Sequence, residues 1–223
     1  MKDYDVLAKC PLFDGVAPED MEAMLQCMQP RAISVEKGEA VFRMDGPAEN
    51  VGIVLEGSLL VYRDDFDGNR SIRAALRPGE LFGETFACAG VRRLPVSVEA
   101  ASPSRALLIR LDRIIETCPS ACVFHNRVVL NMLKVMASKN LLLSQKLEIT
   151  SRRTIRERLL AYLTAQAGSA GRSSFVIPFD RQGLADYLGV DRSALSAEIG
   201  KLKREGIIEN RRSAFTLLKS RFS

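Results

Sequence analysis

The chain has 223 residues, 47% of them hydrophobic and 26% charged, which suffices for two ordinary domains with a core each. It contains no apolar run of the roughly 18 residues that a membrane span requires, and its first ten residues, MKDYDVLAKC, lack the regions of a signal peptide. We therefore expect a soluble, cytoplasmic protein. The net charge of +5 is uneven, because residues 151–223 hold 14 Lys and Arg against 7 Asp and Glu. This basic excess favours a nucleic-acid partner for the C-terminal part.

Short helices are expected first and strands after them. The apolar side of an amphipathic run beginning at Pro18 consists of Met21, Met24, Leu25 and Met28. From residue 31 to 110, short alternating runs recur about every ten residues: RAISV, AVFRM, VGIVLEG, SLLVYRD, SIRAALR, LPVSVEAAS and RALLIRL. Glycine turns separate most of these runs. The spacing predicts a closed antiparallel β-roll or jelly roll, that is, a double-stranded β-helix.

Cupin enzymes use such a roll with inward histidine and glutamate ligands for a metal. The single histidine here, His125, lies outside the strand region, so the sequence disfavours an enzyme, and we expect no catalytic residue and no metal. No Cys-x-x-Cys pair indicates a zinc site or a disulfide framework among Cys10, Cys27, Cys88, Cys118 and Cys122. A thiol-based switch at Cys118 and Cys122 remains an alternative, since residues four apart are neighbours on a helix.

The segment from Arg77 to Ala100 interrupts the strand rhythm with glycines and a predicted helical turn at residues 84–89. Free backbone N–H groups there could receive an anion or the polar edge of a small ligand. Glu84, if turned inward, could accept hydrogen bonds from a hydroxyl. The alternative stays open that Gly79 and Gly83 only turn the chain and that Glu84 is solvated.

A long helix is predicted from Pro119 to Ile149, a length of about 45 Å. Residues recur along it at alternating spacings of four and three: Cys122, Asn126, Val129, Leu133, Met136, Asn140, Leu143 and Leu147. Such a stripe is typical of pairing with a second copy, so we expect a parallel homodimer that uses Val129, Leu133, Met136, Asn140, Leu143 and Leu147. The alternative is that the helix packs on its own domain. Leu141 and Leu142, which lie off the stripe, can serve that purpose as well, so both packings can hold together.

Thr150-Ser151 is expected to cap the next helix, RRTIRERLLAYLTAQA, which supplies core residues to a C-terminal domain. A loop, AGSAGRSS, and a short strand, FVIPF, follow. We therefore predict an effector-sensing β-roll domain at residues 1–118, a dimerisation helix at 119–149 and a DNA-binding domain at 150–223.

The segment DRQGLADYLGVDRSALSAEIGKLKREGII has the pattern of a helix-turn-helix. Asp180 and Asp191 can cap its two helices, and Gly189 turns the chain between them. Leu195, Ile199 and Leu202 share one side of the second helix, leaving a small, polar or basic side for a DNA major groove. The alternative is a helical hairpin whose polar face is solvated.

Two apolar runs around Asn210-Arg211-Arg212-Ser213 predict a β-hairpin, or wing, whose tip arginines suit the DNA backbone. On the second helix, Arg192 can reach guanine or phosphate, and Ser193 and Ser196 can hydrogen-bond base edges or phosphates. The predicted DNA-binding residues are Arg181, Gln182, Arg192, Ser193, Ser196, Ala197, Lys201, Arg211 and Arg212.

A β-roll, a long helix and a winged helix-turn-helix in this order resemble the Crp/Fnr family of bacterial transcription regulators. The resemblance covers nearly the whole chain, and its specific points are Gly83-Glu84, the turns at Gly38, Gly57 and Gly79, and the run DRQGLADYLGVDRSALSAEI. It implies an α+β protein that forms a homodimer, binds an effector in its cyclic-nucleotide-binding-like β-domains, reads a palindromic DNA site and meets RNA polymerase.

The chain departs from this family at the effector site. Cyclic-AMP-binding members hold the phosphate with Arg-Ser where this chain has Leu94-Pro95, and their Thr-Ser pair on the long helix is Lys139-Asn140 here. The sequence thus argues against cyclic AMP, although Arg92 and Arg93 lie nearby. The predicted effector-binding residues are Gly83, Glu84, Thr85, Arg93, Leu94, Pro95, Lys139 and Asn140. Oxygen-sensing members ligate an iron–sulfur cluster with clustered N-terminal cysteines, and Cys10 and Cys27 alone argue against one.

Arg192 matches the family's base-contacting arginine, whereas Ser193 and Ala197 replace a glutamate and a second arginine of the cyclic-AMP members. The DNA site should therefore differ from theirs. The sequence predicts a ligand-responsive, sequence-specific transcription regulator. The alternative is a small-molecule or redox sensor that acts through protein partners without binding DNA.

Overall fold

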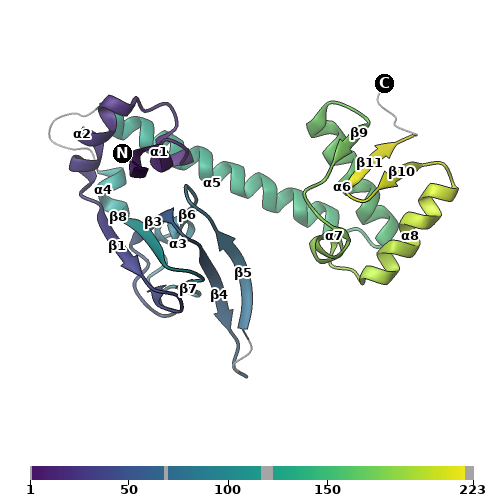
Figure 1. The fold of residues 1–223 in the computed structure, drawn as a ribbon, viewed down its shortest axis with the longest axis horizontal. Helices are drawn as coiled ribbons and strands as arrows, with labels where there is room; N and C mark the ends of the chain where they lie inside the picture. The colour runs from purple at the N-terminus through teal and green to yellow at the C-terminus, as the bar shows by residue number, and fades with distance from the viewer. Residues whose placement is uncertain (1, 68–69, 117–122, 219–223) are drawn as a thin grey trace. The chain divides into compact units, whose positions relative to one another are not determined.

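The computed structural model describes residues 2–67, 70–116 and 123–218. The chain divides into two compact units, residues 1–138 and 139–223, and the long helix α5 (Val123–Thr150) is continuous across the division (Figure 1). The division between the two compact units lies inside α5, between residues 138 and 139. The predicted domain limits at residues 118 and 149 therefore stay a prediction. In the described ranges, no helix is both long and apolar enough to cross a membrane.

Short helices precede and follow the β-structure of the first unit. They are α1 (Lys2–Leu7), the 3-10 helix η1 (Pro11–Phe13), α2 (Pro18–Met28) and α4 (Leu111–Ile115). Met21, Met24 and Met28 are buried, which confirms the predicted apolar side of α2. The sequence did not predict α4, because five residues are too few to show a helical period.

Two four-stranded antiparallel sheets form the roll (Figure 1), with orders β1-β8-β3-β6 and β2-β7-β4-β5. The strands are β1 (Arg31–Val35), β2 (Ala40–Phe42), β3 (Asn50–Glu56), β4 (Leu59–Asp64), β5 (Arg70–Leu76), β6 (Leu81–Phe82), β7 (Ser97–Ala100) and β8 (Ser104–Arg110). The predicted double-stranded β-helix and the α+β class are confirmed. Only β6 was missed, because two residues show no alternation.

Gly52 allows the ring of Phe82 to close the core between the sheets. A methyl group at Gly52 would lie 2.1–2.5 Å from three ring carbons of Phe82, which is 3% exposed and packs on Phe42 at 5.2 Å between ring centroids. We expect Gly52→Ala to lower the free energy of unfolding by about 1–3 kcal/mol, measured by urea unfolding and circular dichroism. Gly168→Ala is the control, because in the described ranges nothing beyond its chain neighbours and the backbone of its own helix lies within 4 Å of that added methyl group. A wild-type urea midpoint for Gly52→Ala would contradict the packing.

One side of the first half of α5 belongs to the core of the first unit. His125, Val128, Asn131 and Met132 are buried there, and the Asn131 amide donates to the Leu12 and Asp14 carbonyls at 3.0 and 2.8 Å. Leu141 and Leu142 are 72% and 65% exposed. The prediction that they pack on their own domain is therefore wrong. Pro119, expected to begin this helix, lies outside the described residues.

The second unit packs its helices on a small antiparallel sheet of order β10-β11-β9. Its elements after α5 are α6 (Ile155–Ala170), β9 (Ser174–Val176), α7 (Arg181–Leu188), α8 (Arg192–Arg204), β10 (Ile208–Arg211) and β11 (Ala214–Leu217). Its core includes Leu159, Leu163, Leu195, Ile199 and Leu202. Leu195, Ile199 and Leu202 were predicted to share the inner side of the second helix, and their burial confirms it.

The capping residue of α6 differs from the prediction. Thr150 is the last residue of α5, where its hydroxyl donates to the Lys146 carbonyl at 2.8 Å, so Thr150-Ser151 does not cap α6. Thr154 caps α6 instead. Its side chain accepts from the Glu157 amide at 3.1 Å while Glu157 accepts from the Thr154 amide at 3.1 Å. This reciprocal pair satisfies two N–H groups that the helix itself leaves open.

Candidate functional site

The two helices of the helix-turn-helix begin and end as the sequence predicts. Asp180 caps α7 by accepting from the Gly183 amide at 2.7 Å, and Asp191 caps α8 by accepting from the Ala194 amide at 2.9 Å. Gly189 ends α7 at a φ of +64°, a left-handed conformation that costs glycine little. The two caps and the glycine turn therefore determine the residue at which the outer side of α8 begins.

Arg158 of α6 holds this turn, which the sequence did not reveal. Its guanidinium donates to the carbonyls of Leu188 and Gly189 at 3.1 and 3.3 Å, and to the Arg152 carbonyl at 2.9 Å. Carbonyls at the end of a helix have no partner within it, and a cation there also interacts favourably with the helix dipole. No sequence pattern links an arginine to carbonyl groups that lie 30 residues further along the chain.

Replacing Arg158 with alanine is expected to lower the free energy of unfolding of the second unit by about 1–3 kcal/mol, because charge-assisted hydrogen bonds to carbonyls are lost. Thermal unfolding followed by circular dichroism measures the change. Arg152→Ala is the control, since its exposed pair with Glu148 at 3.1 Å contributes about 0.5 kcal/mol at most. Equal losses from the two variants would show that Arg158 does not hold the turn.

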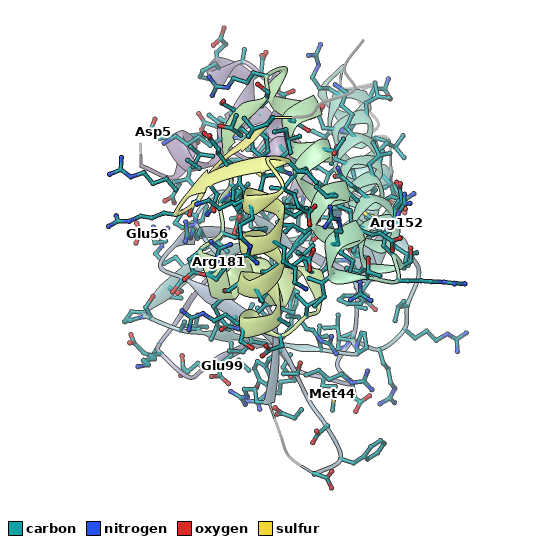
Figure 2. All side chains as sticks on the ribbon, turned by 90° about the vertical axis from the view of Figure 1, so that its right-hand side faces the viewer. Asp5, Met44, Glu56, Glu99, Arg152 and Arg181 are labelled. Atoms are coloured by element: carbon teal, nitrogen blue, oxygen red, sulfur yellow. The ribbon has the colours of Figure 1, made fainter. Side chains whose placement is uncertain are left out.

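Two arginines stand at the starts of the two helices, Arg181 on α7 (Figure 2) and Arg192 on α8. Partial burial, with the charge of Arg192 as the second cause, lowers the pKa of Arg181. In the ranges that the structure describes, neither guanidinium has an ion-pair partner. Positive charge beside helix N-termini favours an anion such as phosphate.

The side of α8 that faces solvent carries the predicted small and polar residues. Ser193, Ser196, Ala197 and Lys201 are exposed. The hydroxyls already donate within the protein, Ser193 to the Asp191 carboxylate and Ser196 to the Arg192 carbonyl at 2.9 Å. In this state both serines offer acceptor lone pairs, so donating to a phosphate requires their hydroxyls to rotate.

The polar groups next to these serines have partners as well. The hydroxyl of Ser193, followed by the Ala194 amide, lowers the pKa of Asp191, which keeps this cap ionised. Lys201 lies 3.6 Å from Glu198, and the Gln182 amide donates to Asp186 at 2.8 Å. Gln182 and Lys201 keep further hydrogen-bonding groups that could contact DNA, because a glutamine amide has a second N–H and an oxygen and an ammonium has three donors.

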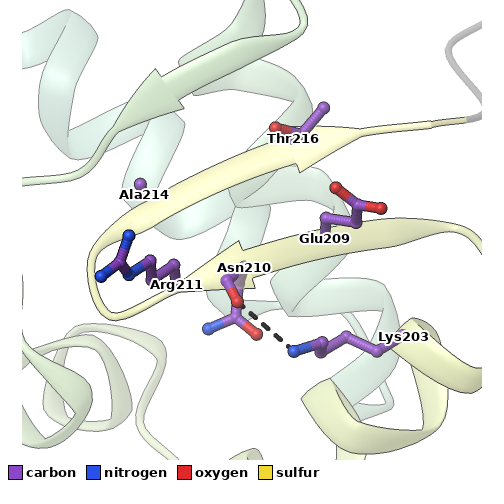
Figure 3. Close-up of a pocket in the computed structure, with 6 residues that line it drawn as sticks. All are labelled: Lys203, Glu209, Asn210, Arg211, Ala214 and Thr216. Atoms are coloured by element: carbon purple, nitrogen blue, oxygen red, sulfur yellow. Dashed lines mark hydrogen bonds between the residues drawn. The ribbon is translucent and has the colours of Figure 1, made fainter.

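The predicted wing is present as β10 and β11, which pair from Ile208↔Leu217 to Arg211↔Ala214. Arg212 lies in the connecting turn at a φ of +54°. The Ser213 hydroxyl donates to the Phe179 carbonyl at 2.9 Å, which anchors the turn to the rest of the unit. Both arginines are exposed. A hollow of about 370 Å³ beside the wing is lined by Lys203, Glu209, Asn210, Arg211, Ala214 and Thr216 (Figure 3).

Lys203 belongs to the same surface, although the sequence reading did not select it. Its ammonium donates to the Asn210 carbonyl at 3.4 Å (Figure 3), which bridges α8 and β10. Lys203 follows Arg192 by eleven residues and Ser196 by seven, which are close to three and two helical turns. That spacing is the signal that could have placed Lys203 on the flank of Arg192 and Ser196.

The predicted effector residues of the first unit have mixed exposure. Gly83 caps α3 (Glu84–Cys88) at a φ of +79°, and Glu84 is 2% exposed and accepts from the Thr85 hydroxyl at 3.2 Å. Glu84 therefore points inward, and the alternative that it is solvated is wrong. Thr85, Arg93 and Pro95 are exposed.

Leu94 is predicted to align with the residues that hold the phosphate in the cyclic-AMP members, and it is buried and hydrogen-bonded within the protein. Its side chain is 3% exposed in the core between the sheets, its amide donates to Gly46 at 2.9 Å and its carbonyl accepts from Asp45 at 2.8 Å. Leu94 therefore offers no polar group to a ligand. Lys139 and Asn140 begin the second unit, so their part in an effector site stays a prediction.

The predicted dimer stripe lies open on the single chain. Leu133, Leu143 and Leu147 are 60%, 68% and 69% exposed, and Asn140 is exposed too, whereas Val129 and Met136 are half-buried. Within the described ranges, these four heptad positions of α5 are thus mostly exposed to solvent. The described residues contain no group of three His, Cys, Asp or Glu that could hold a metal, and Cys118 and Cys122 lie outside those residues.

Family models match both units. Residues 32–120 match the cyclic nucleotide-binding domain, and residues 157–220 match the Crp-like helix-turn-helix domain. The chain is 25% identical over 198 residues to the cyclic AMP receptor protein of Thermus thermophilus, with 89% of this chain and 88% of that protein covered. A Rhodopseudomonas palustris protein is 33% identical over 110 residues, which make up 49% of this chain and 25% of that protein.

Among solved structures, the c-di-GMP responsive global regulator CLP of Xanthomonas campestris has a similar fold. Its TM-score is 0.52 at 17% identity, with 89% of this chain and 100% of that chain covered. A cyclic nucleotide-binding domain and a Crp-like helix-turn-helix domain thus follow each other on one chain, separated by the long helix α5. The chain belongs to the Crp/Fnr family of transcription regulators.

Proposed function

We propose that this ligand-responsive DNA-binding regulator acts as a homodimer that reads a palindromic DNA site. Two copies pair along the exposed stripe of α5, and each inserts the outer side of α8 into a major groove, with half-sites about one helical turn apart. The wing of each copy contacts the sugar-phosphate backbone. The protein acts in the cytoplasm, meets RNA polymerase there and catalyses no reaction.

The observation that carries this proposal is the cationic end of the helix-turn-helix. Arg181 and Arg192 share it without an ion-pair partner in the described ranges, and burial and mutual repulsion lower the pKa of Arg181. Two like charges brought this close cost free energy in the isolated protein. DNA phosphates at the same place relieve the repulsion, since each released counterion favours binding.

Base contact and backbone contact are divided between α8 and the wing in this proposal. Arg192 contacts guanine or a phosphate at the groove floor or edge, and Ser193, Ser196 and Ala197 make polar or methyl contacts beside it. Gln182, Lys201 and Arg181 contact phosphates. Arg211 and Arg212 hold the backbone, and Lys203, which bridges α8 to β10, is added to this set.

We further propose an effector pocket in the β-roll that does not take cyclic AMP. The relative in Thermus thermophilus is named a cyclic AMP receptor protein, but here Leu94 is buried with its amide and carbonyl both engaged. Arg92 and Arg93, which precede Leu94 in the chain, are both exposed. In this proposal Glu84 accepts hydrogen bonds from the effector.

Alanine at both Arg211 and Arg212 tests the wing. We expect binding to every duplex to weaken alike and the slope of log K against log salt to fall by about four for the homodimer, as two phosphate contacts are lost in each copy. Fluorescence anisotropy with a genomic fragment and a scrambled duplex, each at several salt concentrations, measures both effects. A loss confined to one sequence would place these arginines at base edges instead.

The rival is a sensor that acts through protein partners, with a winged helix that never docks on DNA. A gel shift with genomic fragments, with cell extract supplied as a source of effector, separates the two functions. Absence of any retarded fragment at low ionic strength would favour the rival.

A further inference from the structure

A thiol and an imidazole from distant parts of the chain meet inside the first unit. The Sγ atom of Cys27, on α2, lies 3.9 Å from Nδ1 of His125, on α5, across 98 residues of sequence. His125 is 4% exposed, whereas Cys27 is half-buried. Part of the Cys27 residue therefore faces solvent, whereas the imidazole is almost wholly covered.

The other side of the ring settles which nitrogen carries the proton. Nε2 of His125 lies 3.1 Å from the Arg113 carbonyl oxygen, which can only accept a hydrogen bond. The neutral imidazole thus carries its proton on Nε2, and the lone pair of Nδ1 points toward Cys27. This tautomer makes His125 a hydrogen-bond acceptor for the thiol and a base for its proton.

The other thiols in the described ranges have less favourable surroundings. Burial raises the pKa of Cys10 to about 11. Partial burial, with the charge of Glu84 as the second cause, raises the pKa of Cys88. Thiolate, not thiol, is the nucleophile, so neither environment favours reaction. Cys27 alone of these three has a base within contact distance.

We infer that Cys27 is a modification site, a nucleophilic thiol that reacts with hydroperoxides, with His125 as its base. His125 Nδ1 takes the thiol proton, and the thiolate attacks one oxygen of the hydroperoxide. The S–O bond forms as the O–O bond breaks, and the leaving oxygen takes the proton from the imidazolium. The products are a sulfenic acid and water or an alcohol. Sulfur is oxidised by two electrons, and the peroxide is reduced by two.

The position of Cys27 links this chemistry to α5. Met24 and Met28, on the same helix as Cys27, share a core with Val128 of α5. An oxygen added to Cys27 stands at this seam and displaces the contact with His125. The modification therefore acts on the packing of α2 against the first half of α5, outside the proposed effector pocket.

Differential alkylation with mass spectrometry tests the inference on the full-length reduced protein. The protein is exposed to hydrogen peroxide, remaining thiols are alkylated, and the rate of thiol loss is measured at each cysteine, whatever the sulfenic acid later becomes. We expect Cys27 to be lost faster than the more exposed Cys88 by about tenfold, the effect of a thiolate fraction ten times larger. In urea, where the contact is gone, the two rates should converge.

His125→Gln is the diagnostic variant, because its amide can still donate to the Arg113 carbonyl but offers no base. We expect the Cys27 rate to fall to that of Cys88, while Cys88→Ser, the matched control, leaves it unchanged. If His125→Gln does not fold, the comparison of folded protein with urea still decides. Equal rates for Cys27 and Cys88 in the folded protein would overturn the inference, as would an unchanged Cys27 rate in folded His125→Gln.

Discussion

Replacing Leu133 and Leu143 together with aspartate is expected to convert the proposed homodimer into a monomer and to weaken binding to its DNA site by about 10²–10⁴-fold. Both side chains stand on the stripe of α5 and are 60% and 68% exposed on the single chain. In a parallel pair each would face its own copy, so the variant brings carboxylates together in an apolar seam. A monomer contacts only one half-site. In the dimer, binding at the first half-site holds the second recognition helix at high effective concentration beside the other half-site.

Analytical ultracentrifugation measures the dimer, and anisotropy with a palindromic duplex measures the DNA affinity. Leu141→Asp is the matched control, because Leu141 lies on the same helix at 72% exposure but off the stripe. We expect it to leave both measurements unchanged. A double variant that stays dimeric, or a control that dissociates equally, would refute the predicted interface.

Arg192→Ala is expected to weaken binding to the cognate DNA site by about 1–3 kcal/mol per half-site, roughly 5- to 150-fold, and to relax the preference at one base position. The residue follows the Asp191 cap and has no ion-pair partner in the described ranges, so its removal leaves the start of α8 intact. The Arg192 charge is the second cause that lowers the pKa of Arg181. Its removal should therefore raise that pKa toward the ordinary value.

Affinities for a panel of duplexes with single base changes measure this effect, with unchanged thermal unfolding as the check on folding. Arg211→Ala is the contrast, since a backbone contact weakens every duplex alike. Should Arg192→Ala lower the affinity for all duplexes equally, the arginine contacts phosphate and the base reading belongs to other residues of α8.

Sequence patterns sufficed where the determining contacts are local. Asp180, Asp191 and Gly189 act within three or four residues of themselves, so the helix-turn-helix could be predicted with its caps. The β-roll followed in the same way from alternation within each strand. The cap of α6 was misplaced although the sequence carries the signal, because Thr154 has Glu157 three residues later and Thr150 has Arg153 there, and the reciprocal bonds of Thr154 with Glu157 follow that pattern.

Contacts between distant residues escaped the sequence. Arg158 reaches carbonyls 30 residues away, Lys203 reaches Asn210, and Cys27 meets His125 across 98 residues. Each depends on how elements pack, which no periodicity encodes. The effector residues were predicted from the family resemblance. The structure shows that they differ in exposure, since Leu94 is buried in the core and Arg93 is exposed to solvent.

The solitary imidazole gives this protein a built-in spectroscopic label. Because the chain has one histidine, proton NMR of the unlabelled molecule should contain a single pair of ring C–H resonances from it. Both ring nitrogens are engaged, so rupture of either contact shifts that pair. Events at the junction of α2, α4 and α5 can thus be followed at one site without introducing a probe.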